Sequence, residues 1–95
     1  MTDEAEDPVR VPITGELDLH AFAPRDVVSV VEEYVRACRD EGLTSLRLVH
    51  GRGKGVQRAA VQRALRSHPD VESFADAPPG SGGWGATLVS LRRGD

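Results

Sequence analysis

The chain has 95 residues, of which 39% are hydrophobic, and its formal net charge at pH 7 is −3. This length fits one small domain with a modest core, and the acidic balance argues against a nucleic-acid binder that is basic over its whole surface. A single cysteine, Cys38, excludes an internal disulfide and a multi-cysteine zinc site. The sequence contains no apolar run of bilayer length, and its acidic beginning lacks the apolar core of a secretory signal. We therefore expect a cytoplasmic protein without a membrane contact.

The chain begins with a polar, acidic segment, so we expect a disordered tail over residues 1–11 and one domain over residues 12–95. In residues 13–20, "ITGELDLH", apolar and polar side chains alternate, which predicts a half-buried strand ending at the histidine. Two leucines face the core in this strand. Asp18 and His20 share its polar face.

The clearest helix is predicted from about residue 24 to residue 41. A proline suits its first turn, and Gly42 is placed to end it. The apolar stripe that should face the core comprises Val27, Val31, Tyr34, Val35 and Cys38.

A second strand, "SLRLVH", leads into a glycine-rich hinge, "HGRGKG", over residues 50–55. A second helix should follow over residues 56–67, with Pro69 close behind it. Its predicted buried side comprises Val56, Ala60, Val61, Ala64 and Leu65.

A short third strand, "VESF", a flexible glycine- and proline-rich loop, "ADAPPGSGGWG", and a fourth strand, "ATLVSLRR", complete the chain. The resulting order, βαβαββ, predicts an α/β fold of the α+β two-layer sandwich type. Its four-stranded mixed sheet should carry both helices on one face.

Charge is distributed unevenly along the chain. Residues 42–69 contain six cations and no carboxylate, so this segment carries +6 and the remainder −9. A local excess of this kind indicates an anionic partner on one face. The cations are Arg47, Arg52, Lys54, Arg58, Arg63 and Arg66.

The hinge is the strongest candidate for anion binding. Glycines let a backbone approach a ligand closely, and a helix N-terminus presents unpaired N–H groups to phosphate. The alternative is a plain tight turn, because the spacing fits neither a Walker A loop nor a dinucleotide fingerprint. The predicted phosphate-binding residues are Gly51, Arg52, Gly53, Lys54, Gly55 and Arg58.

The histidines that end the first two strands are the candidates for chemistry. If those strands are parallel, His20 and His50 lie at the edge of the sheet where open α/β sheets bind ligands. Asp18 could then orient or activate His20 for proton transfer, although both could also be solvated surface residues. Trp84 lies among glycines, where its indole could stack on a base or cover the sheet edge.

Three short motifs of this chain resemble, in order, the signature blocks of the Smr domain, the small MutS-related domain. "LDLHA" resembles LDLHG, "HGRG" resembles HGxG, and "GGWGATLVSL" resembles a glycine-rich GxTxV ending. The resemblance runs from about Glu16 to Arg92, and it implies a βαβαββ sandwich that binds or endonucleolytically cleaves nucleic acid. Members of the family occur alone or at the C-terminus of MutS2-type proteins.

The resemblance assigns the family's Asp-x-His element to Asp18 and His20. It assigns the HGxG element to His50, Gly51 and Gly53. Where the family has a glycine after LDLH, this chain has Ala21, whose methyl group could narrow the backbone approach beside His20.

The first functional hypothesis is therefore a structure-selective endonuclease that nicks DNA or cleaves RNA. His20 would act as general acid or base, and Asp18 would orient it or hold Mg²⁺ or Mn²⁺, the ions that DNA cleavage would call for. The alternatives are a non-catalytic nucleic-acid-binding module and a small adaptor whose acidic surface binds a protein partner. We expect a monomer in each case.

Overall fold

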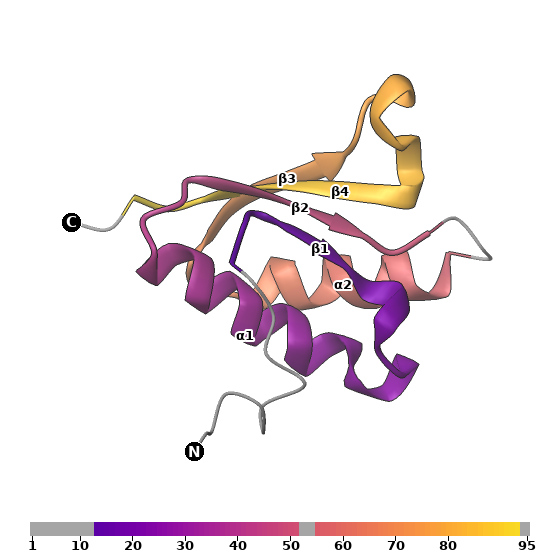
Figure 1. Cartoon of the computed structure of the whole chain (residues 1–95), viewed down its shortest axis with the longest axis horizontal. Coiled ribbons are helices and arrows are strands. Elements are labelled where there is room, and N and C mark those ends of the chain that lie inside the picture. Colours follow the sequence, from indigo (N-terminus) through magenta and orange to yellow (C-terminus); the bar gives the residue numbers. More distant parts are fainter. Residues whose placement is uncertain (1–12, 52–54, 94–95) are drawn as a thin grey trace, which may run out of the picture.

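The computed structural model describes residues 13–51 and 55–93, and these form two layers (Figure 1). A four-stranded sheet of order β1-β2-β4-β3 forms one layer, and the two long helices lie together against one of its faces. The prediction of a mixed sheet with two helices on one face is confirmed. The elements are β1 (Glu16–Asp18), α1 (Val27–Asp40), β2 (Ser45–Val49), α2 (Val56–Ser67), β3 (Val71–Asp76) and β4 (Ala86–Leu91).

The strand pairing places three segments at the same end of the sheet: those that follow β1 and β2 and the one that precedes β4. β1 and β2 are parallel, with Asp18 opposite Val49. β4 runs antiparallel to both β2 and β3 and lies between them, with Ala86 opposite Val49. The carboxyl ends of β1 and β2 therefore lie beside the beginning of β4.

Helix periodicity predicted the part of the core that the two helices supply. All five residues of the predicted stripe on α1 are buried, as are Val61, Ala64 and Leu65 on α2, whereas Ala60 is half-buried. Val56 is 71% exposed, so its predicted burial is wrong. Val56 is the first residue of α2, and at this N-terminal end of the helix the core does not cover the apolar side.

The first strand is shorter than predicted, because a local hydrogen bond ends it. The Asp18 side chain accepts a hydrogen bond from the His20 backbone N–H, and Leu19–Ala21 forms a 3₁₀ turn. Aspartate often competes with the sheet ladder in this way. Leu19 is still fully buried, whereas His20 projects from a turn instead of a strand.

Two other boundaries differ from expectation. A 3₁₀ turn over Pro24–Asp26 precedes α1, and β3 extends two residues further than "VESF". The segment expected to be a flexible loop contains two 3₁₀ turns, Pro79–Ser81 and Gly83–Gly85. Backbone hydrogen bonds across these turns give the segment a defined path into β4.

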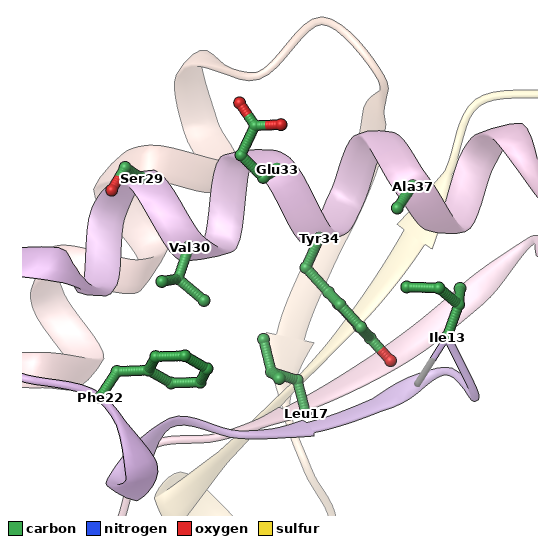
Figure 2. Close-up of a pocket in the computed structure, with 8 residues that line it drawn as sticks. All are labelled: Ile13, Leu17, Phe22, Ser29, Val30, Glu33, Tyr34 and Ala37. Carbon is green, nitrogen blue, oxygen red and sulfur yellow. The ribbon is translucent and has the colours of Figure 1, made fainter. Parts of the chain in front are cut away.

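An apolar groove separates α1 from β1 at the outer side of the molecule (Figure 2). The Tyr34 hydroxyl reaches the free edge of β1, where it accepts a hydrogen bond from the Gly15 N–H and donates one to the Glu16 carbonyl. None of the predicted site residues lines the groove. Its lining comprises Ile13, Leu17, Phe22, Ser29, Val30, Glu33, Tyr34 and Ala37.

Across the described ranges, 13–51 and 55–93, no helix has both the length and the apolar character needed to cross a membrane.

Candidate active site

Asp18 and His20 form a pair at the carboxyl end of β1. One carboxylate oxygen of Asp18, Oδ1, lies 2.8 Å from His20 Nδ1 and also accepts the His20 backbone N–H at 2.9 Å. The backbone hydrogen bond, followed by the bond to the ring, lowers the pKa of Asp18 below its ordinary value. The ionised carboxylate can only accept, so Nδ1 carries the proton and Nε2 of the neutral ring keeps its lone pair.

This pair is open to solvent. The side chain of His20 is 61% exposed and that of Asp18 is 66% exposed. A substrate can therefore approach the His20 ring, which a general acid or base requires.

Gly51 makes room for the imidazole of His20. A Cβ atom at position 51 would lie 2.6 Å from His20 Nε2 and 3.1 Å from its Cε1. The φ angle of Gly51 is +83°, in the left-handed region that favours glycine. The sequence suggested Gly51 only as a phosphate contact, and its packing against the free nitrogen of His20 is an additional role.

His50, directly after β2, is only 4% exposed. Its Nδ1–H donates to the Gly51 carbonyl oxygen at 3.0 Å, so its Nε2 accepts from the hydroxyl of Thr87 at 2.8 Å. Burial lowers the pKa of His50, which favours this neutral form. The contact with Thr87 was missed from the sequence, although the threonine lies inside the GxTxV-like block.

The end of β2 is joined to the turn before β4. The backbone N–H groups of His50 and Gly51 both donate to the carbonyl oxygen of Gly85, at 3.1 and 2.9 Å. This shared acceptor fixes the position of the Gly83–Gly85 turn, and so of Trp84, relative to the residue against which His20 packs.

Arg58 is engaged by an acidic partner. Its Nε and Nη2 atoms donate to the carboxylate of Asp76 at 2.8–3.0 Å, and Gln62 donates to the same carboxylate at 3.3 Å. This pairing lowers the pKa of Asp76 and raises that of Arg58. The guanidinium also lies 5.8 Å from the centroid of the Trp84 ring. Arg58 was predicted to bind phosphate, but Asp76 already balances its charge.

The central hinge residues, Arg52, Gly53 and Lys54, lie outside the described residues, and their predicted phosphate contacts stay predictions. Gly55 is described, and a Cβ atom there would lie 3.7 Å from the Trp84 ring. The ring thus packs beside the start of α2.

Ala21 fits the backbone where the family motif has glycine. It ends the 3₁₀ turn that carries His20, and its side chain is exposed. No non-glycine residue in the described part of the chain has a positive φ angle, so the methyl group of Ala21 causes no backbone strain.

Within the described ranges, no group of three or more histidine, cysteine, aspartate or glutamate side chains is arranged to hold a metal ion. A role for Asp18 as a metal ligand stays a prediction, because Mg²⁺ can bind through one carboxylate together with substrate phosphates.

Residues 17–92 match the family model of the Smr domain. This chain belongs to the Smr domain family. Among its relatives, Endonuclease MutS2 of Thermus thermophilus is 47% identical over 77 residues, and Endonuclease MutS2 of Pelotomaculum thermopropionicum is 39% identical over 79 residues. These matches cover 81% and 83% of this chain but only 10% of each relative, so the chain spans about a tenth of the length of the curated relatives it matches.

Two solved structures share the fold of this Smr domain. The Smr domain of Thermus thermophilus MutS2 superposes with a TM-score of 0.79 at 46% identity, covering 83% of this chain and 99% of that one. YdaL, a stand-alone small MutS-related protein from Escherichia coli, superposes with a TM-score of 0.78 at 25% identity, covering 94% of this chain and 74% of that one.

Proposed function

We propose that this Smr domain binds nucleic acid and cleaves its phosphodiester bonds, selecting structure rather than sequence. The observation that carries the proposal is the His20 imidazole, which is exposed, oriented by Asp18 through Nδ1, and in contact with Gly51 through Nε2. The relatives called Endonuclease MutS2 support the same activity for a domain of this family.

In the proposed reaction, His20 Nε2 accepts a proton from the attacking group. Asp18 keeps Nδ1 protonated and stabilises the imidazolium that forms, as a carboxylate beside a catalytic histidine does. On RNA the attacking group is the neighbouring 2′-hydroxyl, and the imidazolium then returns its proton to the leaving oxygen. On DNA the attacking group is water, and a divalent ion beside Asp18 would supply the activation that water needs.

The remaining site residues position the substrate in this proposal. Arg52, Gly53 and Lys54 bind phosphate from the hinge. His50 is a positioning residue, because its bonds to Gly51 and Thr87 hold the hinge while its burial keeps it from substrate.

The test is incubation of the protein with labelled single-stranded, duplex and branched RNA and DNA, with and without Mg²⁺ or Mn²⁺. We expect the wild type to cut at least one substrate and the His20→Ala variant to cut none. Equal cleavage by both proteins would remove His20 from the mechanism.

A non-catalytic nucleic-acid-binding module is the second candidate. The chain spans only about a tenth of its MutS2 relatives, so the activity of the whole relatives does not transfer automatically. Binding without cleavage of any substrate would select this function. A protein partner at the acidic surface, a monomeric state and a cytoplasmic location stay predictions.

A further inference from the structure

Trp84 and Arg58 form a partly exposed surface at the end of the sheet where the candidate active site lies. Trp84 remains 40% exposed although it is the largest apolar side chain of the molecule. The Arg58 guanidinium lies 5.8 Å from its ring centroid, and the hydrogen bonds that it donates to Asp76 hold it in place. Contacts within the protein thus position both groups without a ligand.

The backbone connects this surface to His20. Trp84 directly precedes Gly85, whose carbonyl oxygen accepts hydrogen bonds from the backbone of His50 and Gly51. Gly51 is the residue against which the His20 ring packs. The turn carrying Trp84, the turn carrying His20 and the start of α2 lie at the same end of the sheet (Figure 1).

The chemistry of the surface favours a flat, neutral ligand over a phosphate. The carboxylate of Asp76 lies 2.8 Å from the Arg58 guanidinium and balances its charge. A phosphate group beside Arg58 would be repelled by this carboxylate. Aromatic rings and guanidinium planes both stack on nucleobases, and such stacking tolerates any base because every base has a π face.

We infer that Trp84 and Arg58 bind one unpaired nucleobase next to the phosphodiester that is presented to His20. The inference rests on the proposed function and specifies its substrate. A base inside a duplex is stacked on its neighbours and cannot reach an indole at the protein surface, so the site selects single-stranded or looped nucleic acid. The Trp84–Arg58 surface thus supplies a preference for unpaired strands.

Fluorescence tests this directly, because Trp84 is the only tryptophan of the chain. The probes are a short single-stranded DNA oligonucleotide and an oligomer of the same length in which every base is replaced by an abasic site. Titrations use the His20→Ala variant at low salt, so that the probe stays intact. We expect the oligonucleotide to quench Trp84 emission. The abasic oligomer should bind, as shown by the anisotropy of an attached dye, without quenching.

Variants separate stacking from general binding. Trp84→Ala should weaken binding of the single-stranded probe about 5- to 150-fold, the usual range for losing one base–aromatic stack, and leave duplex binding unchanged. Trp84→Phe should retain part of the affinity. Val28→Ala is the matched control, because Val28 is 38% exposed and lies on α1 instead of at the site, and it should change neither.

Equal quenching by the abasic oligomer, or an equal effect of Trp84→Ala on single-stranded and duplex probes, would overturn the inference. If cleavage still depends on His20 in that case, the proposed function stands without the stacking surface. If no form of nucleic acid binds the wild type, both fail together.

Discussion

At position 51, a side chain and the His20 imidazole would occupy the same space. Gly51→Ala should therefore displace His20 as well as strain a backbone whose φ angle is +83°. We expect a loss of about 1–2 kcal/mol in the free energy of unfolding from the strain, together with a large loss of cleavage rate. Urea denaturation and a single-turnover cleavage assay measure the two effects.

Gly42→Ala is the matched control for that variant. Gly42 has a similar φ angle, +86°, but a Cβ atom there meets no other atom within 4 Å. It should lose similar stability and keep its cleavage rate. If both variants lose cleavage equally, the contact between Gly51 and His20 does not matter for the reaction.

The Asp18–His20 pair predicts separate effects on rate and on affinity. His20→Ala should reduce cleavage by at least the 10²–10⁴-fold typical of a lost general acid or base, with little change in affinity. Asp18→Asn should also lower the rate, because the amide no longer stabilises the imidazolium. Single-turnover rates and dye anisotropy distinguish the two quantities. Loss of affinity without loss of rate would assign the pair to binding alone.

His50 should make the stability of the fold depend on pH. Burial lowers its pKa from the ordinary 6.5, so the unfolded chain takes up a proton at a higher pH than the folded protein does. Stability should therefore fall as the pH drops below about 6.5, level off below the folded pKa, and show no contribution from His50 above that window. Urea denaturation between pH 8 and pH 5 should show this decline in the wild type. The same decline in His50→Gln would exclude His50 as its source.

At the scale of elements, residues close in sequence were predicted better than contacts between distant strands. The 3.6-residue period gave the core face of α1, because a helix buries a stripe that its own sequence defines. The alternation of apolar and polar residues predicted that the first strand continues to His20. This pattern contains no sign of the hydrogen bond from the His20 N–H to Asp18 that ends β1 at Asp18. The pairs His50–Thr87 and Arg58–Asp76 join separate elements, and no local pattern encodes such a partner.

The hydrogen bond between His50, directly after β2, and Thr87 of β4 is testable by substitution of Thr87. Thr87→Val keeps the shape of the side chain but leaves His50 Nε2 without its hydrogen-bond donor in a buried position. We expect a loss of about 1–3 kcal/mol in the free energy of unfolding, the usual cost of an unsatisfied buried polar group. Thr87→Ser retains the hydroxyl and should lose less. Equal stability of the wild type and Thr87→Val in urea denaturation would mean that water replaces the donor.

Across the whole molecule, the pairing of charges reduces the basic face that the sequence indicated. Of the six cations in residues 42–69, Arg47 pairs with Glu16 and Arg58 with Asp76. Arg63 and Arg66 have no ion-pair partner within the described ranges, which leave out Arg52 and Lys54. Among the described cations of this segment, Arg63 and Arg66 on α2 thus remain for phosphate.

Salt dependence measures how many of these cations contact phosphate. Three to five contacts predict that log K falls linearly with log salt, with a slope of about −2 to −4. Arg52→Ala combined with Lys54→Ala should make the slope shallower by about 1.4 to 1.8, because each lost contact removes about 0.7 to 0.9. Arg47→Gln is the control, since Glu16 already pairs with that guanidinium, and it should leave the slope unchanged. A flat salt response of the wild type would exclude phosphate-led binding and favour the protein adaptor.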